Sequence, residues 1–341
     1  YGRCAHDAIA DARKNVAMLI GAQPEEIIFT GCATEANNLA LRGIDSTLRE
    51  KRRHIIISSV EHPAILEPAL WLRARGWEVS IVPVDHQGWV DPADVKAALR
   101  DDTALVSIMH ANNEVGTIQP IAEIAALAHE RGALMHSDAA QTPGKIAVDV
   151  NELQVDLLSL AGHKFYAAKG VGALYIRNVA AIKSDLQGAG QEQGLRPGTE
   201  NVPAIVGLGM AAQLASTHLP RDQSRLRHLR DEFHRLLQRA IPDLTLNGHE
   251  SMRLPNTLNV SFPRISGRDL LRAVDDVVAA SLGSACHSES DTVSGVIAAM
   301  HIGPTRAMGA VRFSVGRYST HEDITRAAEA LVTAWKRLAE D

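Results

Sequence analysis

The chain has 341 residues, of which 45% are hydrophobic and 22% charged, and its formal net charge is -5. These values are typical of a globular protein with a buried core, and the length allows two domains. The mildly acidic charge argues against direct nucleic-acid binding, and we expect no membrane span because no apolar run is long enough. Cys4, Cys32 and Cys286 lie far apart without a C-x-x-C pair, which favours a reducing, cytoplasmic location.

Short apolar runs alternate with longer amphipathic stretches through the first two-thirds of the chain. The stretches at 91–100 and 121–132 have a helical pattern, and the second ends in Gly132, a residue type frequent at helix C-termini. Strands that alternate with helices indicate βαβ units and a mostly parallel sheet. We therefore predict an α/β fold with a seven-stranded sheet, whose strands lie at 25–30, 54–60, 78–84, 103–110, 133–140, 156–162 and 172–176.

The pattern changes after about residue 212. A charged helical stretch at 224–240 leads into the strand-like runs TLNVSF (257–262) and VRFSV (311–315), and a second charged helical stretch follows them. Such a mixture of strands and helices predicts a small α+β domain packed against the first domain. We expect a large domain at 1–212 and a small domain at 213–341.

Polar residues follow two of the predicted strands, where ligands of open parallel sheets bind. Lys164 comes after the run at 156–162, beside His163, and Asp138 stands at the end of an earlier run. A lysine can hold pyridoxal phosphate as a Schiff base, and a carboxylate can keep the ring nitrogen of that cofactor protonated. Taken singly, Lys164 can equally be a solvated surface charge and Asp138 a helix cap.

Three further strand ends carry candidate residues. Thr34 stands at a helix start, where backbone N–H groups and a hydroxyl suit a phosphate, although an ordinary N-cap gives the same pattern. His62 can stack on a cofactor ring or be a structural histidine. Asn113 can contact a cofactor or a substrate carboxylate, or simply close an Asx turn.

Taken together, the motifs resemble those of the cysteine desulfurases, the NifS/IscS-like members of the class V aminotransferase family. The resemblance begins near residue 2, where the family is already several dozen residues along, so we expect a further N-terminal segment. It continues to about residue 325. Its most specific segments are ATEANN (33–38), VEHPA (60–64), HANNEVGTIQP (110–120), DAAQ (138–141), GHKFY (162–166), GLRPGTENVPAIVG (194–207), RLPNTLNVSF (253–262), GSAC (283–286) and RFSVGR (312–317).

The resemblance implies the type I fold of pyridoxal-phosphate-dependent transferases, with pyridoxal 5'-phosphate as cofactor and no metal. It makes Lys164 the Schiff-base lysine, Asp138 the partner of the ring nitrogen and His62 the imidazole over the ring. A homodimer is implied as well, because Thr199 matches a residue that completes the phosphate site of the neighbouring subunit. The implied cofactor-binding residues are Ala33, Thr34, His62, Asn113, Asp138, Gln141, His163, Lys164 and Thr199.

The same resemblance implies that the small domain supplies the sulfur chemistry. Asn113 and Arg312 match the groups that hold the substrate carboxylate, and Cys286 matches the cysteine that accepts sulfur. The GSACHS setting of Cys286 resembles the group I branch of the family. The run VVAAS (277–281) just before it favours a strand, because valine is enriched in strands.

The implied reaction removes sulfur from L-cysteine, gives L-alanine and leaves a persulfide on Cys286, with Lys164 and His62 as the other catalytic residues. A protein acceptor then takes the sulfur for iron–sulfur cluster assembly, tRNA thiolation or DNA phosphorothioation. Departures such as Ala161 in place of a usual Ser favour a specialised system, such as DNA phosphorothioation. The alternative is a selenocysteine lyase or another class V enzyme, in which Cys286 would be dispensable.

Overall fold

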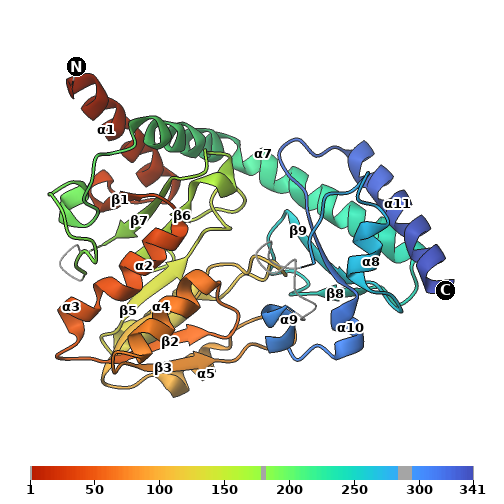
Figure 1. Cartoon of the computed structure of the whole chain (residues 1–341), viewed down its shortest axis with the longest axis horizontal. Coiled ribbons are helices and arrows are strands. Elements are labelled where there is room, and N and C mark those ends of the chain that lie inside the picture. The colour runs from red at the N-terminus through yellow and green to blue at the C-terminus, as the bar shows by residue number, and fades with distance from the viewer. Residues whose placement is uncertain (1, 178–181, 283–293, 341) are drawn as a thin grey trace. The chain divides into compact units, whose positions relative to one another are not determined.

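The computed structural model describes residues 2–177, 182–282 and 294–340, which form two compact units (Figure 1). Two short segments of the second unit, Val84–Trp89 and Asn112–Ile118, lie in the chain between parts of the first unit. The domain boundary predicted at residue 212 stays a prediction. The first unit comprises Tyr1–Pro83, Val90–Ala111 and Gln119–Leu219, and the second comprises Val84–Trp89, Asn112–Ile118 and Pro220–Asp341.

The first unit is built on a seven-stranded sheet with the order β1-β7-β6-β5-β4-β2-β3. Five neighbouring strands, β2 to β6, are parallel to one another, and β7 pairs antiparallel with both β6 and β1. The mostly parallel sheet expected from the sequence is therefore confirmed. Its strands are β1 (Ile27–Thr30), β2 (His54–Ser58), β3 (Glu78–Val82), β4 (Thr103–Ser107), β5 (Leu134–Asp138), β6 (Leu157–Ala161) and β7 (Gly172–Ile176).

Helices pack on this sheet because their apolar faces are stabilised when they are buried against it. α2 (Ala33–Gly43) and α4 (Pro63–Arg73) contact each other and lie side by side over the strands in Figure 1. Their buried residues form one core with Ile55 and Ile57 of β2 and Leu174 of β7. The other helices before α7 are α1 (Gly2–Leu19), α3 (Asp45–Leu48), α5 (Pro92–Ala98) and α6 (Ile121–Glu130).

The long helix α7 (Val202–Ala240) differs from the sequence prediction, which began a helix only at residue 224. In the first unit it approaches α1 closely: a Cβ on Gly209 would lie 2.4 Å from the Cα of Ala12. By length and composition alone α7 could cross a membrane, so the expectation that no run is long enough was wrong. One face of this stretch is nevertheless buried in the first unit through Ile205 and Leu208.

The second unit contains a three-stranded antiparallel sheet with the order β10-β9-β8. Phe233 of α7 and Phe313 of β10 meet edge to face with ring centroids 5.2 Å apart, in the centre of its core. The run VVAAS does not form a strand, which corrects the sequence prediction: only Ser281 makes a bridge, to Arg312. The elements are β8 (Thr245–Asn247), β9 (Thr257–Ser261), α8 (Gly267–Arg272), α9 (Gly295–Ala299), α10 (Pro304–Met308), β10 (Ala310–Ser314) and α11 (His321–Glu340).

Candidate active site

The first unit brings most of the predicted site residues to one edge of its sheet. Because β1, β2, β5 and β6 run parallel, the residues that follow them share the carboxyl edge. His62, Asp138 and Lys164 are close enough for the charges of His62 and Lys164 to act on the Asp138 carboxyl. The predicted residues that follow these four strands are Ala33, Thr34, His62, Asp138, Gln141, His163 and Lys164.

Asp138, the last residue of β5, is only 5% exposed and is held by hydrogen bonds to both carboxyl oxygens. Oδ1 accepts the Ala140 N–H at 2.9 Å, and Oδ2 accepts the Asn37 side-chain amide at 2.7 Å. Burial raises the pKa of this carboxyl, and the two hydrogen bonds together with the charges of His62 and Lys164 oppose that effect. Bound donors and nearby cations are what a buried carboxylate needs in order to stay ionised.

Asn37, which was not singled out from the sequence, is a direct partner of Asp138 in the structure. It is completely buried in α2, 101 positions before its partner Asp138. Its side-chain oxygen has no hydrogen-bond partner among the described residues. The signal was present in the ATEANN motif, which places Asn37 one turn after Thr34 on the same helix face.

The start of α2 suits a phosphate group. The N-cap residue is Cys32, whose side chain makes no capping hydrogen bond, and Thr34 lies inside the first turn. The alternative of Thr34 as an ordinary N-cap is therefore excluded. Backbone N–H groups of an uncapped first turn remain available to an anion. Gly172 of β7 packs tightly here, since a Cβ on it would lie 2.8 Å from the carbonyl carbon of Cys32.

Lys164 and His163 lie in a short 3-10 helix, Gly162–Phe165, directly after β6, and both side chains are exposed. The pKa of His163 is lowered by partial burial and by the neighbouring lysines. A second lysine stands near Lys164: the ammonium of Lys145 donates to the carbonyl of Gln141 at 2.7 Å. Burial, with a contribution from Lys164, lowers the pKa of Lys145 to about 7. Lys145 lies outside the sequence motifs that predict the site.

His62 forms the N-cap of α4, where its Nδ1 accepts the Ala64 N–H at 3.0 Å. The capping bond fixes the orientation of the ring at the end of β2. The site edge thus holds a histidine, a buried carboxyl and an exposed lysine.

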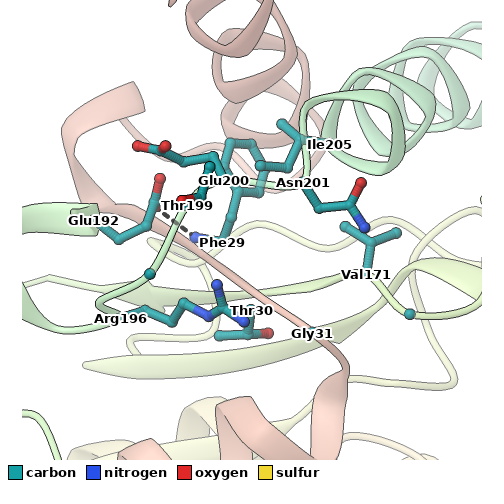
Figure 2. A pocket seen from close by; sticks show the side chains of 12 residues that line it. Phe29, Thr30, Gly31, Val171, Glu192, Arg196, Thr199, Glu200, Asn201 and Ile205 are labelled. Atoms are coloured by element: carbon teal, nitrogen blue, oxygen red, sulfur yellow. Dashed lines mark hydrogen bonds between the residues drawn. The ribbon is translucent and has the colours of Figure 1, made fainter. Parts of the chain in front are cut away.

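Thr199 lies in the loop before α7 and lines a cavity of about 120 Å³ in the first unit (Figure 2). Two ion pairs fix this loop. Glu192 accepts from Arg13 Nη1 at 2.9 Å and Nη2 at 2.6 Å, and it also accepts the Phe29 N–H at 2.7 Å. Arg196 donates to Glu35 of α2 at 2.9 Å. Sequence reasoning missed both pairs, because each joins residues more than 160 positions apart.

The second unit brings Asn113 and Arg312 together, as predicted for a carboxylate-binding pair. Arg312 of β10 donates from Nη1 to the backbone oxygen of Asn113 at 2.9 Å. Burial lowers the pKa of Arg312, and the charge of Glu114 opposes that effect. The pairing leaves the Arg312 guanidinium partly buried beside a carbonyl, a setting in which a second, anionic partner is strongly bound.

Cys286 lies outside the described residues, but the chain on either side of its segment is anchored in the second unit. Before it, the amide of Arg312 donates to Ser281 O at 2.7 Å, and Ser281 N–H donates back at 3.2 Å. After it, the Ser294 hydroxyl donates to Glu114, the residue next to Asn113. Both anchors are therefore on, or directly beside, the predicted carboxylate-binding residues.

Comparison with known proteins gives concordant matches. The family model described as aminotransferase class-V matches residues 1–327. Cysteine desulfurase IscS of Dictyoglomus turgidum is 47% identical over 332 residues, which cover 97% of this chain and 84% of that protein.

Solved structures match as well. A NifS-like protein superposes with a TM-score of 0.91 at 36% identity, covering 100% of this chain and 90% of that one. The SspA structure in complex with cysteine superposes with a TM-score of 0.82 at 35% identity, covering 94% and 89%. These matches confirm the fold predicted from the sequence.

Proposed function

Because the chain belongs to the class-V aminotransferase family, we propose that it is a cysteine desulfurase that takes sulfur from L-cysteine and keeps it as a persulfide on Cys286. Enzymes of this family depend on pyridoxal phosphate, in agreement with the cofactor expected from the sequence. The observation that carries the proposal is the group of Asp138, His62 and Lys164 at the carboxyl edge of one parallel sheet.

These residues fit the cofactor. Bound pyridoxal phosphate supplies an electron sink for the carbanion formed at the substrate Cα. Asp138, with a donor on each oxygen, would hold the proton of the ring nitrogen. The uncapped start of α2, with Thr34 and His163, would bind the phosphate, and Gln141 would reach the phenolic oxygen. Lys164 would hold the cofactor and move the Cα proton through its Nζ.

Asn113 and Arg312 would hold the carboxylate of L-cysteine. A guanidinium and a carboxylate form two parallel hydrogen bonds, which orient the substrate as well as bind it. The SspA structure with bound cysteine, from a protein 35% identical to this chain, supports this substrate class. Cys286 is five positions after the anchored Ser281, so the chain between them spans at most about 17 Å.

The sulfur would be transferred by a nucleophilic displacement at the sulfur atom of the substrate. The thiolate of Cys286 forms an S–S bond with the substrate sulfur while the Cβ–S bond of the substrate breaks. The electron pair of that bond remains on the substrate carbon skeleton, which becomes L-alanine once protonated. A thiol of the acceptor protein then removes the outer sulfur by exchange. Iron–sulfur cluster assembly, tRNA thiolation and DNA phosphorothioation are the acceptor systems that this chemistry serves.

A homodimer is part of the proposal. Thr199 would complete the phosphate site of the partner subunit from its anchored loop. Support comes from exposed apolar side chains in the first unit: Val206, Met210 and Leu214 recur every four residues on α7, and Met18 of α1 is 69% exposed. A partner subunit that covers this stripe would explain the apolar composition of α7 better than a membrane. Such an enzyme would work in the cytoplasm.

The test is product formation by the cofactor-loaded protein. L-Cysteine should yield L-alanine and sulfide in the presence of a reducing thiol, and Cys286→Ser should yield no alanine. A selenocysteine lyase would instead process L-selenocysteine at an unchanged rate after Cys286→Ser. Transamination of L-cysteine without loss of sulfur would contradict the proposal.

A further inference from the structure

A second buried carboxyl lies at the cofactor edge of the sheet, immediately before His62. Glu61 is 9% exposed and stands in the loop between β2 and α4. Its Oε1 accepts two hydrogen bonds, from the Ser58 hydroxyl at 2.6 Å and from the Met109 N–H at 2.9 Å. Its Oε2 is buried and has no hydrogen-bond partner among the described residues.

This uneven arrangement indicates which form of the carboxyl is present. An ionised carboxylate exposes two strong acceptor oxygens, and a buried anion with one oxygen left without a donor is costly. A neutral acid needs only one strong acceptor, the carbonyl oxygen, and Oε1 with its two donors fills that place. Oε2 then carries the proton, and a buried hydroxyl without an acceptor costs less than a buried anionic oxygen without a donor. Burial is also the main reason why the pKa of Glu61 rises from 4.5 to about 8, against the effect of hydrogen bonds from Ser58 and Met109.

Asp138 differs from Glu61 in how its donors are distributed. Each oxygen of Asp138 has its own donor, whereas both donors of Glu61 serve one oxygen. The negative charge of Asp138 also raises the pKa of Glu61. Two neighbouring buried carboxyls do not both ionise readily, so the one with a donor on each oxygen, Asp138, takes the charge.

We propose that Glu61 is a positioning residue that stays protonated at neutral pH, so that the ring-nitrogen end of the cofactor site carries one negative charge, on Asp138. This inference rests on the proposed function for the role of Asp138. Through its Oε1, Glu61 ties the ends of β2 and β4 together, immediately before His62 in the chain.

The first experiment uses the protein without cofactor and compares its unfolding by urea with that of Glu61→Gln. A folded-state pKa raised above the unfolded value of 4.5 means that the stabilising effect of the Glu61 proton is complete below pH 4.5 and is lost as the pH rises toward 8. The unfolding constant of the wild type, relative to that of Glu61→Gln, should therefore rise about tenfold per pH unit between pH 5 and 7.5. Glu67→Gln, which changes an exposed carboxyl on α4, should show no such trend.

If the ratio of the two unfolding constants stayed constant between pH 5 and 7.5, the proposal would be overturned, because Glu61 would then ionise as an ordinary carboxyl. If Glu61→Gln does not fold, infrared spectroscopy of the wild type replaces it. A protonated-carboxyl band at pH 6.5 that disappears above pH 9 supports a neutral Glu61, and the absence of such a band at pH 6.5 overturns it. Neither measurement requires that L-cysteine be the substrate.

The second experiment asks which carboxyl serves the ring nitrogen in the loaded protein. With ¹⁵N in the pyridine ring of the cofactor, the nitrogen signal at pH 7 should be the same in Glu61→Gln and in the wild type, and should shift in Asp138→Asn. A shift in Glu61→Gln as large as that in Asp138→Asn would place the charge on Glu61 and refute the inference. Failure of the proposed function itself would appear separately, as no alanine from wild-type protein.

Discussion

The ion pair between Glu192 and Arg13 should be a major source of stability in the first unit. Both side chains are shielded, with 4% exposure for Glu192 and 19% for Arg13. Removing the Glu192 carboxylate leaves the Arg13 charge without its anionic partner, although Ile27 O still accepts from Nη1, and leaves the Phe29 N–H without this acceptor. Losing one partner of a buried ion pair costs about 3–5 kcal/mol, so Glu192→Ala should lower the free energy of unfolding by about that amount.

The assay is urea unfolding of Glu192→Ala, Arg13→Ala and the double variant. Because the pair is direct, the double variant should be more stable than the sum of the single losses predicts, with a coupling of about 2 kcal/mol. Asp101→Ala breaks the exposed pair with Arg131 and should leave the unfolding midpoint nearly unchanged. A loss below about 1 kcal/mol in Glu192→Ala, or additive single effects, would refute the reasoning.

Three further outcomes follow from the site. Borohydride reduction of the loaded protein followed by peptide mapping should find the pyridoxyl group on Lys164; a label on Lys145 would reassign the site. Arg312→Lys cannot form a bidentate pair and should raise the KM for L-cysteine by at least about tenfold, with an unchanged cofactor spectrum; an unchanged KM would remove Arg312 from substrate binding. Thr199→Ala should weaken cofactor affinity in a homodimer, and a cofactor-saturated wild-type monomer would contradict the role of Thr199.

Much of the sheet and of its carboxyl edge could be predicted from the sequence for a physical reason. The strands at 54–60 and 156–162 are buried on both faces and therefore appear as continuous apolar runs. Parallel strands share one edge, so Asp138 and Lys164 could be expected together once each was seen to follow a strand. In the structure, the two are close enough for the charge of Lys164 to lower the pKa of the Asp138 carboxyl.

The misses have equally physical causes. The first half of α7 contains Pro203, Gly207 and Gly209, which lower helix propensity, and its close contact with Ala12 is a tertiary effect that a local pattern does not show. The run 277–281 has the composition of a strand, yet only Ser281 finds a partner there, and a strand needs a ladder of hydrogen bonds.

Hydrogen bonds between distant parts of the chain were also beyond sequence reasoning. Asn37 reaches Asp138 across 101 positions, and Arg13 reaches Glu192 across 179. Such pairs depend on how the strands are ordered in the sheet, which periodicity does not specify. Glu61 was passed over for a related reason: its unpaired oxygen is visible only once Ser58 and Met109 are placed around it.

Mass spectrometry after a single turnover with L-cysteine tests the central claim most directly. The account predicts one equivalent of L-alanine and one added sulfur atom on the peptide that contains Cys286, with none on the peptides of Cys4 and Cys32. Full alanine production by Cys286→Ser, or sulfur found on Cys32 instead, would contradict it.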